Sequence, residues 1–182
     1  MGRRAGSGVR SRQEEVTTRK NPERCSMTLD LRPVLHRACQ QISPIHPDYA
    51  TRPIQDSFSW SSSLVGCHFD RLYLVVFRSV RWPKADLDLL REHDDRAYAE
   101  ALESGGLLLY FKGQANERRE CLSFCLWETR EQAIKAAGGA SHQSAADISV
   151  RMYESYVLDR YWLKKVATAR GERLDFEPLQ SA

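Results

Sequence analysis

Two polar residues of this 182-residue chain, Asp94 and His142, could carry out acid/base chemistry. Asp94 shares helical spacing with Leu90 and Ala97, so its carboxylate is predicted to point inward with an apolar stripe. A buried carboxylate needs a partner, which Arg78 or His142 could supply. Imidazole titrates near neutral pH, so His142 could act as a general base with Asp94 as its orienting group.

Four more side chains are candidates for ligand contact. Tyr98 and Tyr110 could donate a hydrogen bond to a developing enolate or phenolate oxygen, although a core tyrosine usually satisfies its hydroxyl locally. Trp127 could form a stacking wall, and Arg78 could contact a substrate. His142 lies where the second predicted helix resumes, so it could cap that helix, face a ligand or lie on the surface.

The cysteines and glycine pairs do not predict a metal or phosphate site. Cys121 and Cys125 occupy one predicted strand, where four residues separate the thiols by about 13 Å, too far to share a tetrahedral ion. Gly105-Gly106 lacks the spacing and the Lys-Ser/Thr pair of a phosphate loop. No metal and no cofactor are therefore expected. Five cysteines without a signal peptide indicate a reducing compartment, the cytoplasm, with the nucleus left open.

The elements that must position these residues lie in residues 72–166. Their order is strand, helix, strand hairpin, helix, strand, which predicts an α+β ferredoxin-like βαββαβ domain. The predicted elements are a strand at 72–77, a helix from 82 to 104, hairpin strands at 107–111 and 121–127, a helix from 129 to 152 that breaks at 138–139, and a strand at 156–166. Thr129 and Gln132 can form a capping box at the start of the second helix.

Residues 28–71 are predicted to form an extended arm, because four prolines interrupt any longer element and leave a short helix at 34–41. A cluster of exposed aromatic residues would promote aggregation, so the arm is expected to pack on the core. Its apolar anchors are Ile54, Phe58, Trp60, Leu64 and Val65.

The strand at 72–77 is apolar at both parities, which indicates that both faces of the sheet are covered. Two helices can cover only one face. The arm could cover the other, or a second copy of the sheet could do so and close an eight-stranded barrel. We favour a homodimer with the arm wrapping over it.

Residues 1–27 are predicted to be a disordered basic tail, and residues 167–182 a polar C-terminal tail. Residues 1–26 hold seven Arg or Lys against three acidic residues, so the rest of the chain, with 20 basic and 21 acidic residues, is nearly neutral. A nucleic-acid partner is not expected, because its binder would concentrate positive charge on the folded part. A membrane partner is not expected either, since no apolar run approaches the roughly 20 residues that span a bilayer. Glu14, Glu15 and Glu23 count against mitochondrial targeting.

The chain resembles an uncharacterised fungal protein family in four segments: Leu74-Val75-Val76-Phe77-Arg78-Ser79-Val80, Ser104-Gly105-Gly106-Leu107-Leu108, Cys125-Leu126-Trp127-Glu128-Thr129-Arg130-Glu131 and Met152-Tyr153-Glu154-Ser155-Tyr156. Over about residues 54–166 the wider pattern is similar to the dimeric α/β-barrel superfamily. That superfamily includes antibiotic biosynthesis monooxygenases, small polyketide cyclases, lactone isomerases and stress-response barrels. The fold hosts many unrelated activities.

Within those monooxygenases a Trp in a Trp-x-Ser/Thr-x-Glu stretch lines the pocket, and Trp127 to Glu131 fits this pattern. Quinone-forming members tend to place an Asn four residues earlier, where this chain has Ser123. That departure counts against oxygenase activity, though not against the pocket.

The resemblance implies a small cofactor-independent enzyme that acts on an aromatic or polyketide-like small molecule, in secondary metabolism, by cyclisation, isomerisation or substrate-assisted oxygenation. His142 and Asp94 would be the base and its orienting group, Tyr110 a hydrogen-bond donor and Trp127 a stacking wall. The alternative is a non-catalytic dimeric barrel that binds a small molecule or a protein partner. A sizeable pocket that holds a perturbed His or Asp favours the enzyme, and a barrel filled by side chains favours the alternative.

Overall fold

The computed structural model describes residues 1–2, 31–169 and 171–179. The predicted basic tail therefore lies almost wholly outside the described residues. The elements are α1 (Arg32–Cys39), α2 (Ile54–Ser57), α3 (Trp60–Leu64), β1 (Arg71–Arg81), α4 (Leu87–Ser104), β2 (Leu107–Phe111), β3 (Glu120–Trp127), α5 (Arg130–Ala137), α6 (Ala140–Met152), β4 (Tyr153–Thr168) and β5 (Gly171–Pro178).

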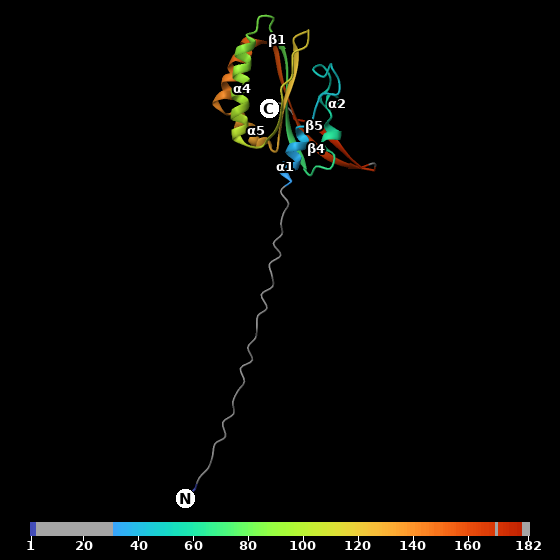
Figure 1. The fold of residues 1–182 in the computed structure, drawn as a ribbon, viewed down its shortest axis with the longest axis vertical. Helices are drawn as coiled ribbons and strands as arrows, with labels where there is room; N and C mark the ends of the chain where they lie inside the picture. The colour runs from blue at the N-terminus through green and yellow to red at the C-terminus, as the bar shows by residue number, and fades with distance from the viewer. Residues whose placement is uncertain (3–30, 170, 180–182) are drawn as a thin grey trace.

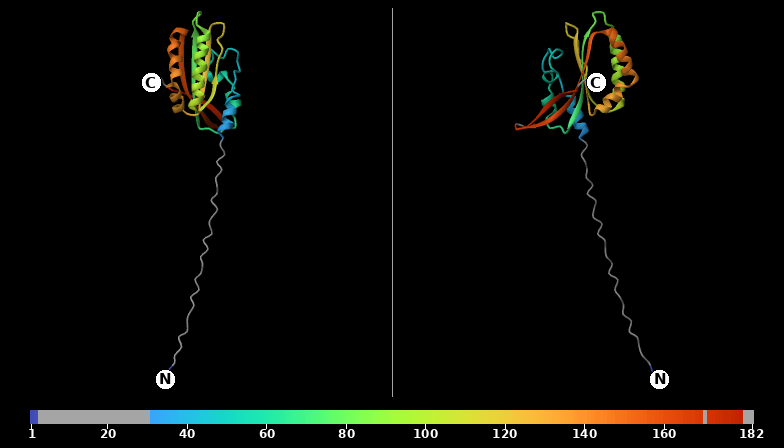
Figure 2. Two further views of the ribbon diagram at one scale, coloured as in Figure 1. Left: turned by 60° about the vertical axis from the view of Figure 1, so that its left-hand side comes forward. Right: turned by 180° about the vertical axis from the view of Figure 1, so that it is seen from behind.

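The strands form one antiparallel sheet in the order β2-β3-β1-β4-β5. The first four strands and the helices between them have the ferredoxin-like βαββαβ connectivity, so the predicted α+β fold is confirmed. Helices α4, α5 and α6 lie on one face of the sheet, and the arm lies on the other (Figure 1). The two additional views in Figure 2 show the same three layers.

Local capping chemistry sets the ends of the helices. Helix α4 begins at Leu87 rather than at residue 82, where its start was predicted, because the Asp86 side chain accepts hydrogen bonds from the N–H groups of Asp88 and Leu89 in the first turn. The helix ends at Gly105, whose φ of 81° suits glycine. Thr129 and Gln132 form the predicted capping box of α5. The predicted break at 138–139 separates α5 from α6.

The larger core cluster lies between the sheet and the arm. Trp60, Phe58 and Ile54 of the arm are nearly fully buried there, and they pack against sheet residues such as Phe124. The indole N–H of Trp60 donates to the carbonyl of Ile54 at 2.9 Å, so burial of this side chain leaves no polar atom unpaired. The prediction that Val65 is also an anchor is wrong, because its side chain is 77% exposed.

Strand β1 is apolar on both faces. Helices cover one of these faces, and the arm of the same chain covers the other. The prediction of a homodimer rests on a second copy of the sheet covering this same face. In the structure, arm residues already bury it.

The C-terminal segment differs from the predicted polar tail at 167–182. Residues 171–178 form strand β5, which pairs antiparallel with the far end of β4. Leu174 and Phe176 alternate along β5 and pack against the arm-side core cluster, and this burial offsets the cost of ordering the segment. In Figure 1 the β4–β5 hairpin extends beyond the body of the domain.

Within the described residues, no helix has the length and apolar character needed to cross a bilayer.

Candidate functional site

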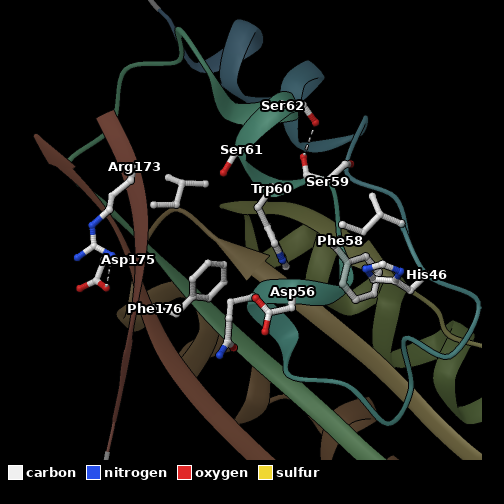
Figure 3. Close-up of a pocket in the computed structure, with 13 residues that line it drawn as sticks. His46, Asp56, Phe58, Ser59, Trp60, Ser61, Ser62, Arg173, Asp175 and Phe176 are labelled. Atoms are coloured by element: carbon white, nitrogen blue, oxygen red, sulfur yellow. Dashed lines mark hydrogen bonds and ion pairs between the residues drawn. The ribbon is translucent and has the colours of Figure 1, made fainter. Parts of the chain in front are cut away.

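Among the described residues, hollows lie on both sides of the sheet. The first is a groove of about 790 Å³ between the arm and β5 (Figure 3). Trp60 and Phe58, which line it, are core residues, and the charged side chains beside them include the Arg173–Asp175 ion pair at 3.8 Å. This groove is wide open to solvent and brings no acid/base pair together, so we do not assign it a catalytic role.

The second hollow, called the cavity below, lies between the sheet and helices α4 and α6. Its volume is about 440 Å³, within the usual range for small-molecule sites. Its surface is mostly apolar and aromatic. Polar and aromatic side chains also line it, among them Ser79 and Arg81 of β1, Asp94 and Tyr98 of α4, Tyr110 of β2, Lys112, Ser123 of β3, His142 of α6, and Tyr153 and Tyr156 of β4.

His142 is held by Glu100 of α4. The His142 Nδ1 atom lies 3.0 Å from Glu100 Oε2, and the backbone N–H groups of Ser141 and His142 donate to the same carboxylate at 3.2 and 3.0 Å. The hydrogen bond to His142 lowers the pKa of Glu100, with help from the two backbone donors, so the carboxylate is ionised near neutral pH. An ionised carboxylate can only accept, so Nδ1 donates this hydrogen bond and Nε2 is the ring nitrogen that remains for a ligand.

Asp94 has a different partner. The Tyr110 hydroxyl donates to Asp94 Oδ1 at 2.5 Å, and Lys112 Nζ lies 2.5 Å from Asp94 Oδ2. Burial raises the pKa of Tyr110, and the Asp94 carboxylate raises it further, so the phenol keeps its proton. Burial opposes the charge on Lys112, but the hydrogen bonds to Asp94 and Asp95 raise the pKa of this ammonium overall.

Aromatic side chains form part of the cavity wall, and of these Tyr98 and Tyr156 are also partly open to solvent. Tyr153 and Tyr156 stack with ring centroids 5.1 Å apart, and Tyr98 lies against Tyr110 at 5.4 Å. Burial raises the pKa of Tyr153 and Tyr156, and it also raises the pKa of the Cys125 thiol in the floor. These groups therefore stay neutral and present a planar, weakly polar surface that suits an aromatic ligand.

The structure brings four of the predicted site residues to the cavity, namely Asp94, Tyr98, Tyr110 and His142. The predicted pairing of His142 with Asp94 is not formed, because each side chain is bound to another partner.

Arg78 does not reach Asp94 or the cavity. Residues 77, 79 and 81 of β1 face the helices, so Arg78 lies on the opposite face by strand alternation. Its guanidinium donates to the arm carbonyls of Ala50 and Arg52 at 2.9 and 2.8 Å, and pairs with Asp159 at 3.5 Å. Arg78 thus fastens the arm to the sheet.

Trp127 lies on the helix-facing side of the sheet but beyond the end of the cavity. It is 3% exposed and packs with Ala101, Leu107 and Ala133 beneath α5. The structure places this side chain in the core rather than in the cavity wall. Ser123, by contrast, does line the cavity, and its Oγ accepts a hydrogen bond from the backbone N–H of Gly113 at 3.0 Å.

Sequence reasoning missed Glu100, Lys112 and Arg81. Glu100 follows Ala97 by three positions, so the inward stripe of α4 could have revealed it. Arg81 shares the parity of Phe77 on β1, but the predicted strand stopped before it. Lys112 comes directly after a short strand, where no local pattern fixes the direction of a side chain. Among the described residues, no group of three or more His, Cys, Asp or Glu side chains is arranged to hold a metal ion.

Comparison with known proteins gives a sequence match over most of the chain. A family model described as PB2B2.08-like matches residues 19–177. The chain is 29% identical over 100 residues to the UPF0643 protein PB2B2.08 of Schizosaccharomyces pombe. The matched stretch is 52% of this chain and 46% of that protein, so the chain spans about half the length of the curated relative it matches.

Solved structures give more distant likenesses. Rv0793 from Mycobacterium tuberculosis superposes with a TM-score of 0.44 at 14% identity, over 49% of this chain and 91% of that one. SnoaB, a cofactor-independent oxygenase from Streptomyces nogalater, superposes with a TM-score of 0.41 at 10% identity, over 50% of this chain and 91% of that one. We transfer no residue role from either protein.

Proposed function

This chain belongs to the PB2B2.08-like family, and we propose that it is a small enzyme that moves a proton on an aromatic or polyketide-like molecule held in the cavity. The products of secondary metabolism are of this kind. Proton transfer in an isomerisation or cyclisation needs no group beyond the side chains that line the cavity.

The observation that carries this proposal is the Glu100–His142 pair at the cavity wall. A carboxylate that fixes one imidazole nitrogen leaves the other nitrogen oriented as a base. The same cavity has neutral aromatic walls and a volume of about 440 Å³, which would bury most of a bicyclic or tricyclic ligand.

In the proposed step, His142 Nε2 takes a proton from an acidic C–H group of the ligand. The C–H bond breaks and its electron pair becomes an enolate, while Glu100 stabilises the imidazolium that forms. The Tyr110 hydroxyl, which keeps its proton, then turns from Asp94 to the enolate oxygen. Return of the proton from His142 to another carbon completes an isomerisation and regenerates the base.

A carbon acid of the right size tests this step without knowledge of the natural substrate. The probe is 2-tetralone, an aromatic ketone with acidic C1 protons, and the measurement is their loss from the proton NMR spectrum in D₂O. We expect the wild-type protein to accelerate exchange and His142→Gln to lower the acceleration by about 100-fold or more. His36→Gln, an exposed change on α1, is the matched control and is expected to exchange at the wild-type rate.

Equal exchange by wild type and His142→Gln would rule out His142 as the base. The alternative function, a barrel that binds a small molecule without reaction, is favoured by one observation, the mutual pairing of Asp94 with Tyr110 and Lys112. Binding of 2-tetralone without any accelerated exchange would support that alternative.

A further inference from the structure

We propose that Arg81 binds a carboxylate of the ligand at the end of the cavity opposite His142, so that the natural ligand is an anionic aromatic or polyketide-like acid. This inference rests on the proposed function of the cavity and adds the charge of its ligand.

The first observation is an incompletely paired cation. Arg81 lines the cavity, and its side chain interacts with the Cys121 thiol, but its Nε atom is buried without a hydrogen-bond partner among the described residues. No ion pair to its guanidinium is found in that part of the chain either. Arg81 as a residue is only partly buried, but its buried Nε–H is a donor without an acceptor, which is costly, so this arrangement favours a ligand group that can accept from it, such as a carboxylate.

Asp94, which lines the cavity, and Glu100, which lies behind His142, already have other partners. Asp94 is bound by Tyr110 and Lys112, and Glu100 is bound by His142. Neither carboxylate is paired with Arg81, so among the described residues the cavity offers no counter-charge to this guanidinium.

A β-bulge keeps a third carboxylate away. The pairing of β1 with β4 shifts register between Val80 and Arg81, so that Arg81 lies opposite Tyr153 and Glu154 is passed over. Without the bulge, strand alternation would put Glu154 on the same face as Tyr156, beside Arg81. With it, Tyr153 lines the cavity instead.

Glu154 instead helps to fix the backbone of Arg81, through Arg119. Glu154 pairs at 3.1 Å with Arg119, whose Nη1 also donates to the carbonyl of Arg81 at 2.5 Å. The N–H of Arg81 donates to the carbonyl of Arg119 at 3.0 Å. Arg119 has a φ of 67°, which is unusual for a residue with a side chain. The backbone of Arg81 is therefore fixed before any ligand arrives.

The position of Arg81 also gives the length of the ligand. The residue after it, Trp82, donates its N–H to the carbonyl of Met152 at the C-terminal end of α6, whereas His142 lies at the N-terminal end of that helix. Ten residues of α-helix rise about 15 Å. A ligand that reaches from His142 to Arg81 must therefore be elongated, as three linearly fused rings with a terminal acid would be.

The test compares two probes that differ only in charge, 2-anthracenecarboxylate and 2-anthracenecarboxamide, with dissociation constants from fluorescence titration. We expect wild type to bind the acid at least about tenfold more tightly than the amide. Arg81→Met should abolish this preference, and Arg81→Lys should retain part of it. Arg96→Met removes an exposed positive charge that pairs with Glu92 on α4, and it should keep the full preference.

Equal binding of acid and amide by wild type would overturn the role of Arg81 and leave the aromatic cavity intact. An acid preference that survives in a folded Arg81→Met protein, as judged by circular dichroism, would overturn it as well. If Arg81→Met does not fold, Arg81→Lys decides. A preference that falls in Arg81→Lys but stays complete in Arg96→Met supports the role of Arg81, and a complete preference in Arg81→Lys would overturn it. Failure of wild type to bind either probe would instead contradict the proposed function.

Discussion

At the scale of single residues, the Glu100–His142 pair joins two roles that are usually separate. Glu100 accepts two backbone N–H groups in the first turn of α6, which is what a helix-capping carboxylate does. It also binds the ring of His142. The pH dependence of stability reports on the Glu100 carboxylate, whose pKa is lowered mainly by the ring contact, and the exchange assay reports on His142.

Glu100→Gln is expected to flatten the acid side of the stability curve. The folded-state pKa of Glu100 lies below its usual value, so its contribution to stability is complete above the unfolded-state pKa of about 4.3 and is lost as the pH falls through the lower, folded-state value. Urea unfolding midpoints between about pH 6 and pH 3 measure this. Wild type should lose more stability over that range than Glu100→Gln does.

The control is Glu103→Gln, an exposed change on the same helix that should follow the wild-type curve. Parallel curves for wild type and Glu100→Gln would show that the hydrogen bonds of Glu100 contribute no pH-dependent stability.

The inward direction of Asp94 could be predicted at this scale, but its partner could not. Helical spacing fixes the face on which a side chain lies. It does not fix which residue of another element comes opposite, and that depends on how α4 and α6 pack. Asp94 and His142 therefore both reach the cavity, and each is bound by a residue that the periodicity alone did not select.

At the scale of elements, the loop from β2 to β3 depends on one glycine. Gly113 lies so close to β3 that a Cβ atom there would meet the carbonyl oxygen of Leu122 at 1.8 Å. Its N–H and carbonyl are bound by the side chains of Ser123 and Cys121. The close approach thus fixes the part of the cavity floor that contains Ser123.

Gly113→Ala is expected to lower the free energy of unfolding by at least about 2 kcal/mol, because the obstructing atom belongs to the backbone of a central strand. Chemical denaturation measures the change. Gly138→Ala is the matched control, since a Cβ there has no contact closer than 3.5 Å and φ is −78°. Equal stability of the two variants would mean that the loop can move away from β3 at little cost.

Element types were more predictable than element ends. The capping box of α5 and the glycines that follow α4 are local signals, and both act as predicted. Strand β5 was missed because its charged residues suggested a polar tail. Leu174 and Phe176 do have the two-residue spacing of a strand. Their burial depends on contacts with the arm and on pairing with β4, which the local sequence does not show.

At the scale of the whole molecule, the arm contributes a large part of the core. Trp60 is 1% exposed and contacts the rings of Phe58, Phe124 and Phe176, so it joins the arm to both β3 and β5. The sheet would otherwise present a broad apolar face to water. Stability of the domain should therefore respond strongly to changes in this one arm residue.

Trp60→Ala is expected to cost about 3–5 kcal/mol in the free energy of unfolding, from lost burial and from the cavity that remains. Urea denaturation provides the value, and Ser61→Ala, an exposed change in the same helix, should cost less than about 0.5 kcal/mol. A loss below 1 kcal/mol for Trp60→Ala would indicate that the arm is not firmly packed on the sheet.

The arm on the sheet also has a consequence for assembly. A second chain that docked its own sheet on this face would have to compete with a segment already tethered beside it, through the short connection between α3 and β1. Tethering of this kind corresponds to an effective concentration on the order of millimolar. Dimers formed through this face are thus expected to require exchange of arms between chains or release of the arm, and simple mass action at ordinary protein concentrations would not produce them.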